Sequence, residues 1–486
     1  MLAHCLKWGP GPQLLLALAA LLTLLGLLGR PARADDTAVE QEAKAIVDLF
    51  GGAYDDPRLA AYISGVGARL VQTTSMAKEP FTFTVLDSPV VNAFSLPGGH
   101  VYVTRGLLAL VGNEAELAGV LGHEIGHITA HHAESRERRA AIARLGVGLL
   151  SIFGARLATP EIGHLVQRFA GVGGLYYIER FSRDQEFQAD VLGTRTLAKA
   201  GYSAYAMSSF LDRLEAETRL DNRIAGRPED DQRFSMFADH PRTDDRVKRA
   251  IAEAGALPRN PDLRRNAYLR KIDGLLYGDN PERGVVRGGW FIHPTLRVAF
   301  AVPPGFQVEN TETRVIVEGG DDAGFIFDRA PEPFDGAPEA YLAEKSQSKT
   351  ADPIQPMEIG GLPAATVPGQ AKRDDGSVTN LQLVVIRTDP ATLYRFVFIY
   401  PNRDPRRFVE LYDQVAASFR RISLADAASI KPLHIRIVTV QSWDSIDSFA
   451  THMATGPFSR ERFLVLNGLA PDARLKPGRT VKLVTE

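Results

Sequence analysis

The 486-residue sequence holds a single cysteine, Cys5, which lies near the amino terminus. Residues 1–34 have the features of a secretory signal peptide, so we expect Cys5 to be removed with them. The mature chain would then form no disulfide. Any metal site in it must use histidine and carboxylate ligands.

The sequence also lacks an excess of charge of either sign. It contains 56 Lys and Arg residues and 58 Asp and Glu residues, which gives a net charge of −2. This balance gives no electrostatic reason to expect nucleic acid or an anionic membrane surface as a partner. The composition, 45% hydrophobic and 23% charged, is typical of a folded soluble protein, and the length suggests about three domains.

Long apolar runs are scarce, and the amino terminus holds the most prominent. Lys7 precedes the run from Leu14 to Leu28, and Ala32-Arg33-Ala34 forms a small-x-small cleavage site before Asp35. The run is shorter than the ~20 residues that span a bilayer as a helix. We therefore predict secretion across the inner membrane into the periplasm and leave membrane association open. An uncleaved anchor is the alternative.

A second uncharged run, Leu145 to Ala155, is too short to cross a membrane. We predict a buried helix there, with a membrane-contact segment as the alternative.

The hydrophobic pattern predicts an α+β protein. Residues 35–258 should form a mainly helical domain with a small sheet, and residues 259–287 a linker with a short helix. Residues 288–424 read as an α+β domain with a mainly antiparallel sheet, and residues 430–486 as a strand, two helices and a strand. Helices are expected at 37–72, 114–139, 181–200, 205–220, 339–346 and 405–419, and strands at 81–86, 90–94, 100–104, 298–303, 313–319, 324–328, 381–387 and 394–400.

The predicted helix at 114–139 contains His123-Glu124-Ile125-Gly126-His127, an HExxH pattern. Residues four apart on a helix are turned by only about 40° and lie roughly 6 Å apart, so His123 and His127 can bind one ion. Glu124 is turned by about 100° and lies beside the metal. There it can act as the catalytic base that takes a proton from water.

Zinc needs a third protein ligand, and position 133, where a longer HExxHxxGxxH motif would place it, is Ala133. On a continuous helix His131 would lie about 12 Å from His123, so we expect His131 and His132 to be surface residues. A carboxylate from the helix at 181–200 is the other route. Glu186 is the candidate ligand, and it gives a His2Glu site with an open fourth position.

Asp190 lies four residues after Glu186 and shares its helix face. Its carboxylate can accept the free ring N–H of a histidine ligand and fix the tautomer of that ring.

Four blocks of the sequence carry a family resemblance: NAFSLPGGHVYVTRGLL, NEAELAGVLGHEIGHI, FSRDQEFQADVLGTRTLAKAGY and HPRTDDR. They resemble the CAAX-prenyl-protease/HtpX-like family of gluzincin zinc metallopeptidases, and in particular its soluble periplasmic branch. The resemblance covers roughly residues 36–255. It implies Zn²⁺ as cofactor, with the ligands, base and neighbour named above, and a role in protein quality control of the cell envelope.

Two residues of the last block are further candidates. His240 or Arg246 could donate to the oxyanion that forms when water attacks the peptide carbonyl. Alternatively, His240 could take the open position on zinc and hold the enzyme latent. A third reading makes the block a helix start with Arg246 in an ion pair.

The segment from Val91 to Ser95 matches a family block, and its expected role is an edge strand that pairs with the extended substrate. Asn92, Ala93 and Phe94 are the candidate substrate-binding residues. An ordinary sheet strand is the alternative.

Residues 430–486 contain Asn467-Gly468-Leu469 and Leu475-Lys476-Pro477-Gly478. These segments match the pattern of a LysM module, a small peptidoglycan-binding fold, which residues 430–486 resemble. Trp443 stands where a glycine is usual. Peptidoglycan is therefore a candidate ligand, with a protein-docking or structural role as the alternative.

Together these patterns predict a zinc-dependent endopeptidase that hydrolyses internal bonds of misfolded or unassembled envelope proteins. One alternative is a hydrolase of peptidoglycan crosslinks. Another is an envelope assembly factor or chaperone with a mostly latent protease site.

Overall fold

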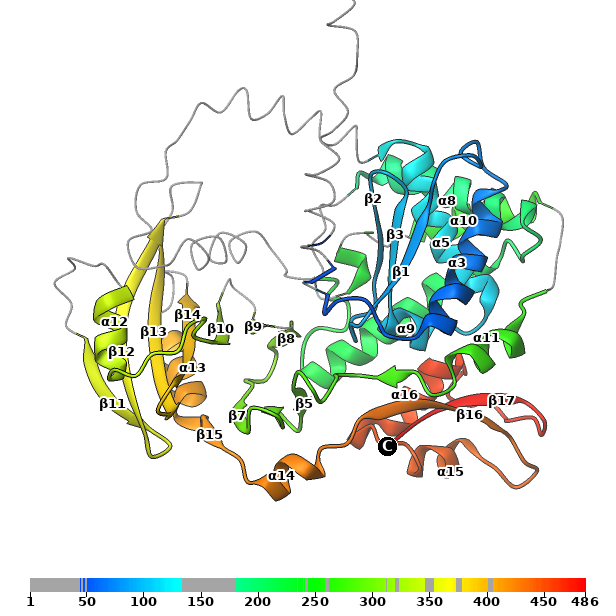
Figure 1. Ribbon diagram of the computed structural model, residues 1–486. Coiled ribbons are helices and arrows are strands. Elements are labelled where there is room, and N and C mark those ends of the chain that lie inside the picture. The colour runs from blue at the N-terminus through cyan, green and yellow to red at the C-terminus, as the bar shows by residue number, and fades with distance from the viewer. Residues whose placement is uncertain are drawn as a thin grey trace, which may run out of the picture. The chain divides into compact units, whose positions relative to one another are not determined.

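The computed structural model confirms the α+β class (Figure 1). The signal segment and the run at 145–155 lie outside the residues it describes. Those residues are 44, 47, 48, 50–132, 181–233, 235–238, 240, 244–257, 262–311, 313–319, 323–345, 354–372, 378–400 and 405–486. Within these ranges no helix has both the length and the apolar character needed to cross a membrane.

The first domain packs helices against a three-stranded sheet. The strands are β1 (Thr82–Leu86), β2 (Ala93–Leu96) and β3 (His100–Thr104), in the order β1-β3-β2, so β2 lies at an edge. β3 runs parallel to β1 and antiparallel to β2. The helices are α3 (Pro57–Val71), α4 (Arg105–Leu110), α5 (Glu114–Thr129), α8 (Arg183–Lys199), α9 (Ala206–Ala225), η2 (Met236–Ala238) and α10 (Asp244–Gly255).

Local sequence signals account for where these helices begin. Asp56 accepts hydrogen bonds from the backbone of the first turn of α3, and Pro57 occupies a helix position that needs no N–H donor. Ser182 and Gln185 form a capping box at the start of α8. Helix α5 ends at Thr129, and the chain turns at His131, whose φ is 54°. The last part of the predicted helix, residues 133–139, lies outside the described residues.

The segment predicted as a linker packs into the molecule. It forms α11 (Arg265–Ile272), β4 (Leu276–Tyr277) and β5 (Val285–Arg287). Tyr268 and Ile272 are fully buried and belong to the same hydrophobic core as α5. β4 pairs with β16 (Leu433–Thr439), so this segment supplies a strand to the carboxy-terminal unit.

The carboxy-terminal unit, residues 430–486, has the predicted strand-helix-helix-strand order. It contains β16, α15 (Ile446–Thr451), η3 (Gly456–Phe458), α16 (Ser459–Asn467) and β17 (Thr480–Thr485), and its sheet has the order β17-β16-β4. Phe463 and Val484 share the hydrophobic core of the first domain. Buried Lys482 donates through Nζ to the carbonyls of Ala109, Leu110 and Val111 at the end of α4.

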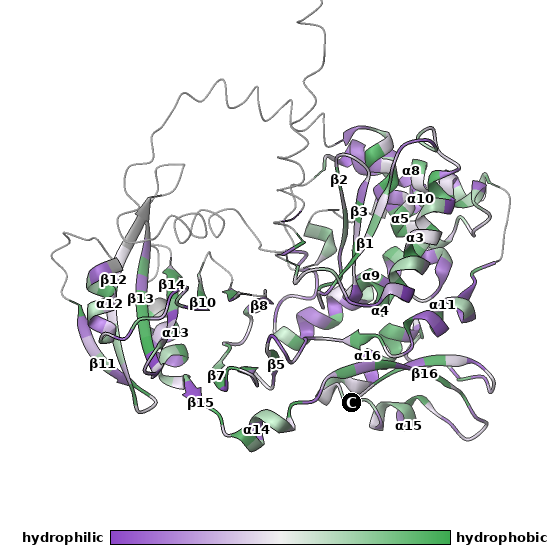
Figure 2. Cartoon of the chain, in the orientation of Figure 1, coloured by the Kyte–Doolittle hydropathy of each residue, from purple (hydrophilic) through white to green (hydrophobic). Residues whose placement is uncertain are grey.

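The middle domain is α+β and mainly antiparallel, as predicted. Figure 2 shows both polar and apolar residues along its helix α13 (Pro405–Ser418), whose Leu411 and Val415 face an aromatic core. A four-stranded sheet has the order β15-β7-β6-β5 and a seven-stranded sheet the order β11-β12-β13-β14-β10-β9-β8. The remaining elements are β6 (Trp290–His293), β7 (Val298–Ala301), β8 (Gln307–Asn310), β9 (Arg314–Glu318), β10 (Gly324–Arg329), α12 (Pro338–Lys345), β11 (Gln355–Ile359), β12 (Leu362–Lys372), β13 (Val378–Asp389), β14 (Thr392–Tyr400), α13 (Pro405–Ser418), β15 (Arg420–Arg421) and α14 (Leu424–Ser429).

Candidate metal centre

Close packing of α5 against α8 brings the two halves of the predicted metal site together. A Cβ on Gly126 would lie 3.0 Å from the carbonyl oxygen of Ala189, and one on Gly193 would lie 2.9 Å from the backbone nitrogen of His123. Side chains at these two glycines would therefore push the helices apart. Their absence lets Glu186 on α8 reach the histidines of α5.

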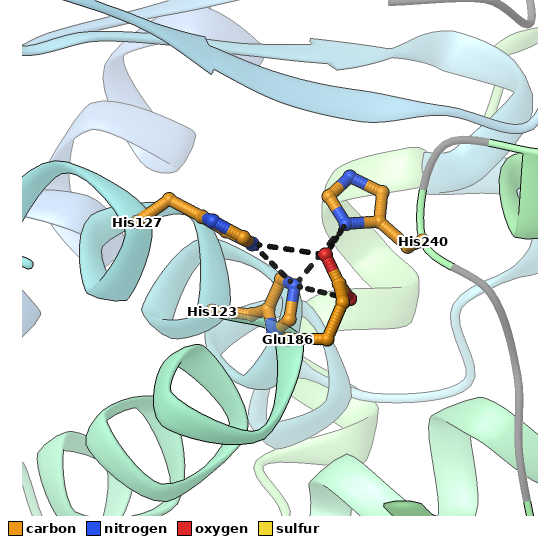
Figure 3. Close-up of side chains that lie close together, drawn as sticks. All are labelled: His123, His127, Glu186 and His240. Carbon is orange, nitrogen blue, oxygen red and sulfur yellow. Dashed lines mark hydrogen bonds and ion pairs between the residues drawn. The ribbon is translucent and has the colours of Figure 1, made fainter. Parts of the chain in front are cut away.

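Four buried donor atoms converge where the sequence predicts three ligands (Figure 3). His123 Nε2 lies 3.0 Å from His127 Nε2 and 3.6 Å from Glu186 Oε2, and His127 Nε2 lies 3.4 Å from Glu186 Oε1. Ligands placed tetrahedrally at 2.0–2.1 Å from a zinc ion are about 3.3 Å apart. The spacing and chemistry of this donor set therefore fit one zinc ion.

His240 supplies the fourth donor. Its Nδ1 lies 3.3 Å from His123 Nε2 and 3.0 Å from Glu186 Oε1, and its ring is buried. The predicted open position is thus faced by an imidazole nitrogen. A site with four protein donors is the closed arrangement, whereas catalytic zinc sites leave one position for water.

The predicted base, Glu124, is fully buried beside this cluster. Ser95 Oγ donates to Glu124 Oε2 over 3.0 Å, and Glu124 Oε1 lies 3.6 Å from His240 Nε2. Within the described part of the chain, Oε1 accepts no hydrogen bond. Ser95 therefore holds one carboxylate oxygen while the other is directed toward the metal centre.

The comparison with known families agrees with this geometry. The family model described as "Peptidase family M48" matches residues 57–254, which include every donor of the cluster. Residues 57–254 form a Peptidase family M48 domain. The predicted family resemblance is thereby confirmed.

Three curated relatives are similar to the M48 domain region. A beta-barrel assembly-enhancing protease of Yersinia pestis is 32% identical over 44% of this chain and 43% of its own length. A Vibrio cholerae protein described as "Putative beta-barrel assembly-enhancing protease" is 35% identical over 43% of this chain and 44% of its own length. The mitochondrial metalloendopeptidase OMA1 of Schizosaccharomyces pombe is 28% identical over 38% of this chain and 55% of its own length. The chain spans less than half the length of the two bacterial relatives.

Asp190 and Arg246 form the layer behind the ligands of the M48 domain. Asp190 Oδ1 lies 3.0 Å from Nδ1 of His123, on the side of that ring opposite to the Nε2 atom at the centre. Arg246 donates to both oxygens of Asp190, over 2.7 and 2.8 Å, pairs with Glu186 over 2.7 Å and donates to the carbonyl of His240. This placement favours the ion-pair reading of Arg246 over oxyanion stabilisation.

His132 is a residue of the centre that the sequence interpretation missed. The expectation of a surface position is right for His131, which is exposed, but wrong for His132, which is 3% exposed. Its Nδ1 lies 3.0 Å from His127 Nδ1, and its Nε2 lies 3.1 Å from Gln188 Oε1. With His127 donating to His132 and His132 donating to Gln188, both contacts are satisfied and the tautomer of His127 is fixed.

The predicted substrate-binding residues lie on or beside the edge strand β2. Thr104 N donates to the carbonyl of Asn92, so the main chain of Asn92 pairs with β3. Because pairing alternates along an antiparallel strand, the main chains of Ala93 and Ser95 face away from β3. The Phe94 ring instead stacks in the core, 4.9 Å from the ring of Tyr102.

The charges of the centre favour a bound cation. Burial alone would lower the pKa of His123, but hydrogen bonds to Asp190 and Glu186 raise it to about 10. Burial likewise opposes ionisation of Glu186, yet the charge of His240 and hydrogen bonds hold its pKa well below the usual range. Burial raises the pKa of the Glu124 carboxyl, which makes its ionised form a stronger proton acceptor. The carboxylates of Asp190 and Glu186 thus stabilise positive charge at the place where a metal ion would replace a proton.

Proposed function

We propose that the protein is a zinc-dependent endopeptidase of the cell envelope, with His123, His127 and Glu186 as its metal ligands. The observation that carries the proposal is the convergence of these donors beside a buried carboxylate, Glu124. Two imidazoles and one carboxylate are a donor set typical of catalytic zinc in peptidases.

The chain's own residues supply the remaining chemistry. Bound zinc would acidify a water molecule and polarise the scissile carbonyl. Glu124 takes the proton of the attacking water on Oε1 and passes it to the leaving amine, while Ser95 keeps Oε2 in place. Asp190 and His132 hold the ligand rings in orientation through their distal nitrogens.

We further propose that His240 makes the resting enzyme latent. Its Nδ1 faces the position that water and substrate need, at 3.3 Å from His123 Nε2. His240 precedes α10 and is tied to that helix through the hydrogen bond from Arg246 to its carbonyl oxygen. Displacement of the His240 ring alone would open the fourth position, because the three ligands lie on α5 and α8.

The proposed substrates are misfolded or unassembled envelope proteins, and the proposed location is the periplasm. Two relatives bear names that refer to beta-barrel assembly, which supports a role in the envelope. The edge strand β2 also supports unfolded proteins as substrates, because backbone pairing binds extended chains with little dependence on their side chains.

The decisive experiment compares substrates. The mature zinc-loaded chain is expected to cut unfolded casein and to leave purified sacculi intact, and Glu124→Gln should abolish casein cleavage. Cleavage of sacculi alone would identify a hydrolase of peptidoglycan crosslinks instead. Full complementation of a deletion strain by Glu124→Gln would mean that the biological role is that of an assembly factor or chaperone.

The carboxy-terminal unit is a second candidate site, for peptidoglycan. Trp443 is 78% exposed on the turn between β16 and α15, where an aromatic ring can stack on a sugar. Co-sedimentation with sacculi tests this, and Trp443→Ala should weaken it. If the wild type and Trp443→Ala sediment equally with sacculi, the carboxy-terminal unit would instead have a docking or structural role.

A further inference from the structure

A cavity of about 180 Å³ opens directly beside the metal centre, on the side of His127. Ser95 and His127 both line it, so it is continuous with the residue that holds the base and with a metal ligand. Any group in this cavity would lie next to the bond being cut.

The walls of the cavity are mainly apolar. Exposed Glu79 and His131 also line it and place polar groups toward solvent. An apolar lining with a polar border suits an uncharged, hydrophobic occupant. The apolar wall consists of Met76, Pro80, Leu96, Pro97, Ile128 and Phe181.

The turn between β2 and β3 gives the cavity a preformed wall. Gly98 and Gly99 have φ angles of 85° and 87°, which favour glycine. Gly99 also packs its Cα directly against the carbonyl of Pro80, where a side chain would collide. Such close packing fixes the turn against the loop that carries Met76, so the cavity does not have to be created by the substrate.

The size of the cavity decides what it can hold. Pockets for whole small-molecule ligands measure about 300–1,000 Å³, so this cavity has room for one side chain rather than a ligand. A substrate strand paired with the outward main chain of Ser95, which lines the cavity, would place side chains at intervals of about 3.3 Å per residue. A side chain within two residues of the cleaved bond therefore reaches the cavity.

We propose that this cavity is a specificity pocket that binds a large apolar side chain of the substrate, within two residues of the scissile bond. The inference rests on the proposed endopeptidase function and adds a preference to it. The backbone pairing accepts many sequences, and the pocket selects among them those with Leu, Met or Phe at one fixed position. Such residues are buried in folded proteins and exposed in unfolded ones, so the preference favours unfolded chains.

Cleavage-site mapping on a peptide library with the zinc-loaded mature chain tests the proposal. We expect Leu, Met and Phe to be enriched at one fixed position within two residues of the cut. Met76→Trp fills the pocket and should lower kcat/KM for these peptides at least 10-fold, while peptides with Ala at that position change less than about threefold. Lys78→Trp adds the same bulk to an exposed residue of the same loop outside the cavity, and should change neither.

Two outcomes would overturn the pocket and leave the enzyme intact: cleavage without a fixed apolar position, or an equal effect of Met76→Trp on both peptide sets. A wild-type chain that cuts no peptide would overturn the proposed function instead. Binding of the same peptides to zinc-loaded Glu124→Gln, followed by fluorescence anisotropy, tests the pocket without turnover. Unchanged affinity after Met76→Trp in that background would contradict it.

Discussion

Ser95 on the edge strand β2 donates a hydrogen bond to Glu124 on α5, with Oγ 3.0 Å from Oε2. The main chain of Ser95 faces away from β3, toward the place where a substrate strand would pair. One residue therefore links the predicted substrate-binding edge to the predicted base. The other oxygen of Glu124 is left for the proton of the attacking water.

Ser95→Ala should lower kcat of the endopeptidase about 3- to 10-fold and change KM little. The reason is the loss of one hydrogen bond, worth about 0.5–1.5 kcal/mol, that orients the base in the transition state. Steady-state kinetics on a fluorogenic peptide measures the effect. Ser95→Thr keeps the hydroxyl and should stay within about twofold of the wild type; an unchanged kcat for Ser95→Ala would show that the contact does not position the base.

His132→Asn should weaken zinc binding about 10- to 100-fold, because partners of metal-bound histidines typically contribute that much. His132 orients His127 from behind through the 3.0 Å contact between their Nδ1 atoms. Competition with a chromophoric chelator gives the affinity. His131→Asn, at the exposed neighbour, is the matched control and should bind zinc like the wild type; equal affinities for all three proteins would rule out the positioning role.

His240→Ala should raise the basal rate of casein cleavage several-fold and leave zinc content at one ion per chain. Removal of the His240 imidazole, whose Nδ1 faces the fourth position, opens that position to water, while three ligands remain to hold the metal. A gel assay together with metal analysis measures both. A fall in rate at constant zinc content would instead support the alternative in which His240 stabilises the oxyanion.

Lys482→Met should destabilise the M48 domain together with the carboxy-terminal unit by about 2–3 kcal/mol. The substitution leaves buried carbonyls at the end of α4 without their donor, and each lost partner costs about 1–3 kcal/mol before the gain from the apolar side chain. The midpoint of denaturant unfolding reports the change. Lys476→Met, at an exposed lysine of the same unit, should stay within about 0.5 kcal/mol of the wild type.

The sequence predicts the ligand set because helical phase is local. His123 and His127 are one turn apart, and Glu186 and Asp190 share a face of α8 for the same reason. The strands and helices predicted for the middle domain lie close to their observed positions, because their apolar residues alternate or recur with clear periods. Strands β6, β8, β11, β12 and β15 were not predicted.

The contacts of Ser95 and His132 could not be predicted in this way. Ser95 is 29 residues from Glu124, and no periodicity relates a strand to a helix over that distance. Extension of α5 as a straight helix places His132 on the surface. The helix ends at Thr129, and the positive φ of His131 turns the chain so that His132 comes back to His127.

The segment at 259–287 shows a different reason for a discrepancy. Its Pro, Asn, Asp and Gly residues are typical of a linker, but the few apolar residues between them, such as Tyr268 and Ile272, are fully buried. Composition averages over a segment, whereas packing depends on which face its apolar residues share. The role of β4 as a third strand beside β16 depends on residues far along the chain.

Metal analysis of the purified mature chain tests the central proposal most directly. The wild type and Glu124→Gln are predicted to hold one zinc ion per chain, because Glu124 is not a ligand. Glu186→Gln is predicted to lose most of its zinc, since it removes the carboxylate from the donor set. A wild type without stoichiometric zinc, or a Glu186→Gln variant that keeps its zinc and its activity, would contradict the proposed centre.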